Sequence, residues 1–279
     1  MLEALEYPFF RRALVAGLLA SIACGVVGTY VVVKRISSIS GSLSHAAFGG
    51  VGLGYLLGFD PIIGAAGFSL ISSAGLGIVY RRVRGSLDTL LAMFWSTGMA
   101  LGMLFIALTP GYAPDLMSYL FGSILFVPES FLWIAALVDL IVVGAVLLLF
   151  KEFQAVAFDE EFAEVIGIPV GPILHILLGL IALTVVTLIR IVGVIMVIAL
   201  LTFPAATARH WCESLTRMMI FAGVLSAIST TFGLFGSYWL STVSSVQIPT
   251  GPLTVLIAAF LFAASSFIRT RSKKRSTNP

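Results

Sequence analysis

The sequence predicts an all-α fold, a polytopic membrane helical bundle of about eight or nine transmembrane helices with one short half-helix. The first observation is composition: 59% of the 279 residues are hydrophobic and only 10% are charged, whereas soluble domains carry about 25% charged residues. The second is a series of apolar runs about as long as a membrane is thick. These runs do not alternate apolar and polar residues as the strands of a membrane β-barrel do. Lipid therefore surrounds most of this chain.

Nine apolar runs, separated by charged residues or by proline and glycine, are the predicted spans: 13–33, 43–58, 61–80, 88–108, 131–150, 172–189, 192–208, 217–239 and 251–268. The run 43–58 is short, so we expect a broken or tilted helix there. A further apolar stretch, 113–127, is bounded by Pro114 and Pro128. It is too short to span a membrane, which suits a half-helix or re-entrant segment.

The spans leave no room for a soluble domain, so we expect one transmembrane domain over 1–268 and a basic cytoplasmic tail over 269–279. Lys and Arg are retained on the cytoplasmic side of membrane proteins. Nine spans place Arg11, Arg12 and Arg190 on one face and thirteen basic residues on the other: Lys34, Arg35, Arg81, Arg82, Arg84, Lys151, Arg209, Arg217, Arg269, Arg271, Lys273, Lys274 and Arg275. The C-terminus is therefore predicted to be cytoplasmic and the N-terminus outside, in the cell (inner or cytoplasmic) membrane. The net charge of +3 is too small to suggest a nucleic-acid partner.

Glycines recur at every fourth position in two predicted spans. Gly50, Gly54 and Gly58 do so in the second span, and Gly98 and Gly102 in the fourth. Such stripes let helix backbones approach closely in lipid, where no hydrophobic effect drives helices together. We expect tight packing at these positions; the alternative is a face that lines a solute pathway.

Five serines and a histidine cluster in residues 37–45, where the second span begins. Buried polar groups in lipid are costly unless they are partnered, so they tend to face a cavity or another helix. Ser40, Ser42 and Ser44 are therefore candidates for lining a pathway. A neutral His45 can offer a ring nitrogen to zinc, manganese or iron. The spacing alone favours a packed, hydrogen-bonded histidine over a metal ligand.

Asp139 lies in the middle of a predicted span. An ionised carboxylate at the bilayer centre costs about 2.5–3.5 kcal/mol, so it must be protonated, paired or facing water. A structural partner and a place along a solute path are both open. His175 is expected at the membrane interface, and His210, which follows Arg209, is expected to be solvated. None of the histidines falls in a metalloprotease pattern.

No lysine in this chain follows a glycine, so the sequence contains no P-loop for ATP. Paired carboxylates and nucleophile–base spacings are also absent. We therefore expect no enzymatic activity and no permanently bound cofactor. If ATP energises this chain, a separate partner subunit hydrolyses that ATP.

Two stretches that the orientation makes cytoplasmic suit a protein partner. Residues 159–168 form an acidic amphipathic helix that ends at a glycine. Residues 203–209 combine a proline with small residues, as a short helix lying in a groove would. For each stretch, simple capping of a helix end at the interface is an equally good interpretation.

Five stretches in register resemble the permease subunit of ABC-type zinc/manganese/iron uptake transporters. Residues 28–37 are similar to the end of that family's first span, and Leu43–Ala46 contains its Ser-His-Ala signature. Asp115–Gly122 is similar to its Tyr-Leu-Phe-Gly segment. Pro204–Arg209 and Pro249–Pro252 match two further signatures. The resemblance runs from the first span to the last.

This resemblance implies an ATP-driven metal-ion importer that carries a divalent metal ion as its substrate. It implies a homodimeric permease in membrane lipid, a cytoplasmic ABC ATPase subunit and an extracytoplasmic solute-binding protein. His45 matches the position of a transient intramembrane metal ligand, and the resemblance implies a pathway along the dimer axis. The resemblance also implies that the family hexapeptide couples the permease to the ATPase. Its residues are Pro204, Ala205, Ala206, Thr207, Ala208 and Arg209.

Two departures from the family pattern bear on which metal is carried. Manganese-type relatives have an aspartate four residues before the histidine, where this chain has Gly41, and often an acidic residue at the position of Gln247. Their absence argues against a hard, oxygen-rich manganese site. Zinc, iron, or a site of serine, backbone and water ligands stays open. The alternatives are a permease for a metal chelate, such as a siderophore or cobalamin, and an ATP-independent metal channel.

Overall fold

The computed structural model describes residues 5–80, 87–110, 122, 124–244, 246 and 248–276. Within these residues the chain forms helices and no β-strand, as predicted. In chain order the elements are α1 (Pro8–Val33), α2 (Ser37–Leu57), α3 (Pro61–Tyr80), α4 (Leu87–Leu108), the 3-10 turn η2 (Ile124–Phe126), α6 (Glu129–Leu148), α7 (Phe150–Phe158), α8 (Glu160–Val165), α9 (Val170–Val192), α10 (Val194–Arg209), α11 (Leu215–Ser244) and α12 (Thr250–Ser276).

Each predicted span corresponds to one helix, with α7 and α8 as short helices between α6 and α9. Seven of the described helices are long and apolar enough to cross a membrane: α1, α3, α4, α6, α9, α11 and α12. The two remaining predicted spans correspond to α2, which carries the serine run, and to α10, which has only 16 residues. The predicted count of eight or nine spans is therefore approximate.

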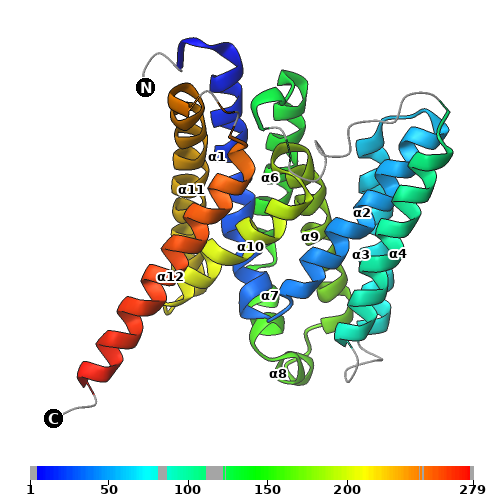
Figure 1. Cartoon of the computed structure of the whole chain (residues 1–279). Helices are drawn as coiled ribbons and strands as arrows, with labels where there is room; N and C mark the ends of the chain where they lie inside the picture. Colours follow the sequence, from blue (N-terminus) through cyan, green and yellow to red (C-terminus); the bar gives the residue numbers. More distant parts are fainter. Residues whose placement is uncertain are drawn as a thin grey trace.

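The long helices form three neighbouring groups (Figure 1). One side holds α2, α3 and α4, the other side holds α11 and α12, and α1, α6, α9 and α10 lie between them. The central helices join the groups, because α1 packs against α11 and α10 packs against both α2 and α12. The two termini lie at opposite ends of the bundle, and α7 and α8 lie at the C-terminal end (Figure 1).

The helices differ in how much of their surface they bury. Most residues of α9 and α10 are buried, which marks them as central helices. In contrast, α6 exposes large apolar side chains such as Leu140, Leu147 and Leu148. Lipid tails are as apolar as leucine, so such exposed side chains suit a surface that faces the membrane.

The predicted start of the helix over 43–58 is wrong. The helix α2 begins at Ser37 and contains the whole serine run. Serine hydroxyls can donate to carbonyls one turn earlier in the same helix. Ser42 and Ser44 do so at 3.0 and 2.8 Å. A polar run can therefore stay helical within a buried segment. The helix ends at Gly58 in the left-handed conformation, with φ of 73°.

Tight packing is confirmed at four of the five stripe glycines. A Cβ atom at Gly98 would lie 2.6 Å from the Cα of Ala46, and one at Gly54 would lie 2.6 Å from the Cα of Pro61. Gly50 and Gly102 approach their neighbours as closely. Gly58 is the exception, since nothing lies within 4 Å of the position of its Cβ and it serves instead to end α2.

Most of the predicted half-helix over 113–127 lies outside the described residues. The described part consists of Gly122 and the turn η2, which leads through Val127 and Pro128 into α6. At the other end of the chain, α12 continues as far as Ser276. The segment predicted as a separate tail therefore begins as a continuation of that helix.

Candidate functional site

His45 lies on α2 with only 8% of its surface exposed. Its ring stacks on Trp95 of α4, with centroids 4.2 Å apart and planes inclined by 13°. Among the described residues, Nδ1 is buried and has no hydrogen-bond partner. The histidine is therefore packed, as its spacing suggests, but it is not satisfied at Nδ1. An unpaired ring nitrogen is free to accept a proton or to bind a metal ion.

The positions along α2 decide which candidate serines accompany His45. Successive residues of a helix are rotated by about 100°, so Ser42 shares the face of His45 and Ser40 and Ser44 point elsewhere. Ser42 donates to the carbonyl of Leu91 in α4 at 3.0 Å, whereas Ser40 and Ser44 donate within α2 at 2.7 and 2.8 Å. All three hydroxyls are buried. Only Ser42 is brought to the side of His45.

Gly41 lies one turn before His45 and on nearly the same face. A Cβ atom at Gly41 would lie 3.2 Å from Cδ1 of Ile198 in α10 and 3.7 Å from the ring of Trp95. Apolar groups therefore occupy the space in front of Gly41. Within the described part of the chain, no group of three or more His, Cys, Asp and Glu side chains could hold a metal ion.

Asp139 is buried on α6, on a face that repeats through Phe131, Ala135 and Val142. This helix packs against α1 and α9, whereas α2 packs chiefly against α3 and α4. Cys24 of α1 lies near enough for an electrostatic interaction with the carboxyl group. Oδ2 of Asp139 has no hydrogen-bond partner among the described residues. The structure therefore does not bring Asp139 to His45.

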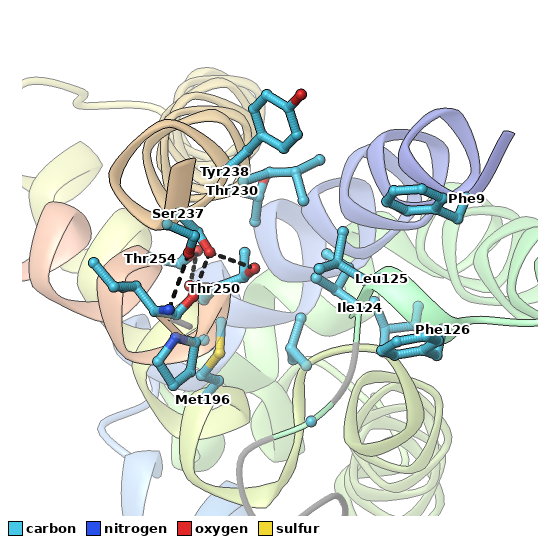
Figure 2. A pocket seen from close by; sticks show the side chains of 18 residues that line it. Phe9, Ile124, Leu125, Phe126, Met196, Thr230, Ser237, Tyr238, Thr250 and Thr254 are labelled. Atoms are coloured by element: carbon cyan, nitrogen blue, oxygen red, sulfur yellow. Dashed lines mark hydrogen bonds between the residues drawn. The ribbon is translucent and has the colours of Figure 1, made fainter. Parts of the chain in front are cut away.

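A cavity of about 490 Å³ lies between the start of α1, the turn η2, α10 and the α11–α12 junction. Figure 2 shows Ser237, Thr250 and Thr254 facing one another on one side and Ile124 and Phe126 on the opposite side. Thr250 donates to Ser237 at 3.2 Å, and Thr254 donates to the carbonyl of Thr250 at 3.0 Å. The first bond joins α12 to α11 beside the cavity, and the second lies within α12.

The helix α10 lies between this cavity and His45. Met196 lines the cavity, while Ile198, two residues later, fills the space at Gly41. The cavity is thus a separate space from the surroundings of His45, with the packed side chains of α10 between the two.

The hexapeptide from Pro204 to Arg209 forms the last turns of α10. Four of its residues are buried inside the chain: Pro204, Ala205, Thr207 and Ala208. Ala205 and Ala208 pack against Met218 and Ala222 of α11. Only Ala206 and Arg209 reach the surface, so a partner could touch the hexapeptide only there. Trp211, which follows directly, is 53% exposed and was not singled out from the sequence.

The end of α1 ties the hexapeptide to α8. Arg209 donates from Nη1 to the carbonyl of Val32 at 3.1 Å. Two residues further on, the ammonium group of Lys34 pairs with the carboxylate of Glu160 in α8 and donates to the carbonyl of Val156 in α7 at 3.0 Å. Sequence reasoning missed this ion pair, although a basic residue after a span and an acidic run on the same predicted face were its signal.

The remaining histidines are structural. His175 bonds the carbonyl of Gly171 through Nδ1 at 2.8 Å and packs over Gly77 of α3. The expectation that His210 is solvated is wrong, because it is partly buried and its Nδ1 lies 3.0 Å from the hydroxyl of Ser265. Desolvation, with a smaller effect of the charge of Arg269, lowers the pKa of His210 below its ordinary value.

The long helices, their lipid-facing sides and the polar groups buried between them define a multi-pass membrane protein with the architecture of a transport subunit. The model of the ABC 3 transport family matches residues 6–269. The chain belongs to this family.

Relatives of the same length support the assignment. An uncharacterized membrane protein of Synechocystis is 42% identical and covers 96% of this chain and 94% of its own. The manganese transport system membrane protein MntC of Listeria monocytogenes is 32% identical and covers 93% and 92%. Among solved structures, PsaBC from Streptococcus pneumoniae in complex with Fab matches with a TM-score of 0.86 and 30% identity, covering 99% of this chain and all of that one.

Proposed function

We propose that this chain is the membrane permease subunit of an ATP-driven importer of divalent metal ions. The observation that carries the proposal is the likeness to a manganese transport system membrane protein over 93% of this chain and 92% of that one. Membership of the ABC 3 transport family supports ATP hydrolysis by a partner subunit. This division of labour agrees with a sequence that contains no P-loop.

His45 is the proposed transient ligand for the metal ion on its way across the membrane. Its unpaired Nδ1 is the most basic unsatisfied atom of α2. Imidazole suits zinc, iron and other transition metals, whereas carboxylate-rich sites suit manganese. The hydroxyl of Ser42, backbone carbonyls, water and a second copy of the chain are the sources of further ligands. Ser40, Ser44 and Asp139 are placed less well for that role.

The proposed orientation puts α7, α8 and the end of α10 in the cytoplasm, following the excess of Lys and Arg at that end. There the exposed residues of the hexapeptide, Ala206 and Arg209, would contact the ATPase. The opposite end, with the cavity beside Thr250, would face the solute-binding protein. The functional unit is proposed to be a dimer of this chain with two ATPase subunits.

Uptake by the reconstituted system tests the proposal. The chain is placed in liposomes with its ATPase and binding protein, and zinc, manganese and iron compete for entry. ATP-dependent uptake of at least one free ion is expected. Uptake of chelates alone would favour a chelate permease instead, and uptake without ATPase and ATP would favour a channel. Either result overturns the proposal.

A further inference from the structure

The helix α12 carries a continuous apolar stripe on its outer face. Leu256, Phe260, Ala263 and Phe267 follow one another at spacings of three and four residues, which place them on one side of a helix. The side chains of Leu256, Phe260 and Phe267 are 65%, 71% and 57% exposed. The stripe lies on the part of α12 that is long and apolar enough to cross a membrane. It therefore suits contact with lipid tails.

The apolar stripe ends in a cation. Arg271 lies one turn after Phe267 on the same face of α12, and its guanidinium carbon lies 4.4 Å from the centroid of the Phe267 ring. This arrangement is a cation–π contact. A long basic side chain at the end of a span keeps its stem on apolar surface while its charge reaches the lipid headgroups. Arg271 is therefore placed where a surface that suits lipid tails meets the polar layer of the membrane.

A tryptophan beside α12 marks the same level of the membrane. Trp211 follows the end of α10, is 53% exposed, and donates from Nε1 to the hydroxyl of Ser265 in α12 at 2.7 Å. Tryptophan is enriched at membrane–water interfaces because its ring is largely apolar and its N–H is polar. Arg269 lies one turn after Ser265. The helix α12 therefore passes from the level of the tails to the level of the headgroups close to Ser265.

The end of α12 is basic, and no acidic residue nearby in the sequence balances its charge. Five of the seven residues from 269 to 275 are basic: Arg269, Arg271, Lys273, Lys274 and Arg275. No Asp or Glu follows Glu213 in the sequence. The helix continues to Ser276, and Figure 1 shows its last turns projecting away from the other helices. Clusters of about four to eight basic residues directly after a span attract anionic lipids.

Charge and polarity together distinguish a lipid from other partners. A second copy of this chain would bring the same positive charges to the end of α12, and like charges repel. Nucleic acid supplies phosphates but no alkyl chains for Phe267 and Ile268, which are 57% and 53% exposed. An anionic phospholipid supplies a negative headgroup for the basic residues and alkyl chains for the stripe before them. A lipid therefore matches this surface in both respects.

We propose that the end of α12 binds the headgroups of anionic phospholipids in the adjoining membrane leaflet, with Arg269 and Arg271 as the first contacts. The inference goes beyond the proposed function, because it needs no metal ion, no ATPase and no ATP. Ser265 extends the effect of this contact, since it bonds Trp211 and lies 3.0 Å from Nδ1 of His210. A lipid that holds the end of α12 therefore also steadies the residues that follow the hexapeptide.

Native mass spectrometry of the purified full-length chain in detergent tests this inference with phosphatidylglycerol and phosphatidylcholine as probes. The anionic lipid should bind at least about tenfold more tightly, because each basic residue near an anionic surface is worth about fivefold in affinity. Arg269→Gln combined with Arg271→Gln should weaken phosphatidylglycerol binding by at least about tenfold and leave phosphatidylcholine binding unchanged. The matched control is Arg35→Gln combined with Arg217→Gln. It removes exposed charges of the same sign outside α12 and should leave phosphatidylglycerol binding nearly unchanged.

Three results of this experiment overturn the inference: equal binding of the two lipids to the wild-type chain, unchanged phosphatidylglycerol binding in the α12 variant, or an equal loss in the control. Displacement of bound phosphatidylglycerol by a short RNA also overturns it, because the surface would then favour nucleic acid. None of these results bears on metal uptake, so the proposed function is tested separately.

A second measurement locates the lipid on the chain. Ile268→Cys, in a Cys212→Ser background, is labelled with a fluorophore, while the buried Cys24 stays unlabelled. In nanodiscs that contain equal parts of phosphatidylglycerol and phosphatidylcholine, brominated phosphatidylglycerol should quench this label more strongly than brominated phosphatidylcholine does. Equal quenching by the two lipids, or a cross-link from this position to a second copy of the chain, overturns the inference.

Discussion

Two buried polar side chains, one in the middle of α2 and one at the end of α1, differ in whether they have a partner. His45 is buried against Trp95, and its Nδ1 has no partner among the described residues. Lys34 is just as buried, yet it pairs with Glu160 and donates to the carbonyl of Val156. Burial without a partner costs free energy, whereas burial with a partner orders the elements that supply it. The unpaired Nδ1 of His45 is thus open to a ligand, whereas the paired ammonium group of Lys34 joins α1 to α7 and α8.

This comparison separates the expected consequences of mutation. A change at His45 should affect what passes through the chain and leave its assembly intact. A change at Lys34 should affect how α1, α7 and α8 are held together. The predictions below test that separation, from the largest expected effect to the smallest.

Replacement of His45 by alanine should reduce metal uptake by more than about tenfold, because even groups that only orient a metal ligand are worth about 10–100-fold. Uptake and co-purification with the ATPase are measured on the same preparation. Co-purification should be unchanged, since Nδ1 makes no hydrogen bond to a described residue. Thr184→Val removes another buried, unpaired polar atom and should not change uptake. Normal uptake in the His45 variant would remove this residue from the pathway.

Replacement of Lys34 by methionine should destabilise the chain by about 3 kcal/mol, because it leaves the carboxylate of Glu160 without its partner at a site that is 19% exposed. Thermal unfolding in detergent and ATP hydrolysis coupled to uptake are the measurements. Lys151→Met is the matched control, since Lys151 is exposed near the same end and such changes lie within about 0.5 kcal/mol. Equal effects of the two substitutions would show that the ion pair is not structural.

Replacement of Gly64 by alanine should destabilise the packing of α3 on α2 by about 1–3 kcal/mol, because the new methyl group would overlap the backbone of Gly50. Gly67 lies on the same helix with nothing within 4 Å. Its replacement by alanine should be neutral or stabilising by up to about 1 kcal/mol, from helix propensity. Thermal unfolding of the two variants gives the comparison. If both substitutions changed the stability in the same direction, close backbone packing around α2 would be contradicted.

The pH dependence of the contact between His210 and α12 is the smallest expected effect. The pKa of His210 in the folded chain is lowered, chiefly by desolvation. The neutral form is therefore favoured by folding, and the stabilisation is complete above the unfolded pKa of about 6.5 and declines as the pH falls below it. Thermal unfolding followed from about pH 7 to about pH 5.5 should show this loss. His210→Gln should make the thermal stability depend less on pH. An unchanged pH dependence in this variant would show that His210 is not its cause.

Much of the fold was predictable because membrane thickness sets the length of a span. Each predicted apolar run corresponds to a helix, and the close approaches at Gly50 and Gly98 follow from their spacing. The start of α2 was missed because hydropathy alone marks Ser37 to Ser42 as polar, whereas their hydroxyls bond within the helix. Gly58 was misread because a glycine that ends a helix and one that packs against a neighbour look alike in a pattern.

The candidate site was predictable only in part. The unusual polar stretch pointed to His45, but a pattern cannot tell that Ser42 bonds to the backbone of α4 or that the helix of Asp139 packs against α1. The hexapeptide was found, yet most of its side chains are buried. Whether a residue touches a partner or its own chain depends on neighbours that are distant in sequence.

By itself the sequence determined that the chain is a membrane helical bundle, and its five signatures indicated the family. These properties depend on local hydrophobicity and on short runs of residues. Only the tertiary structure decided that Lys34 meets Glu160, which lies 126 residues away, and that Ile198 fills the space at Gly41. Such contacts form because a bundle brings distant segments together, and in lipid each buried polar group is then either satisfied by those segments or left unpaired.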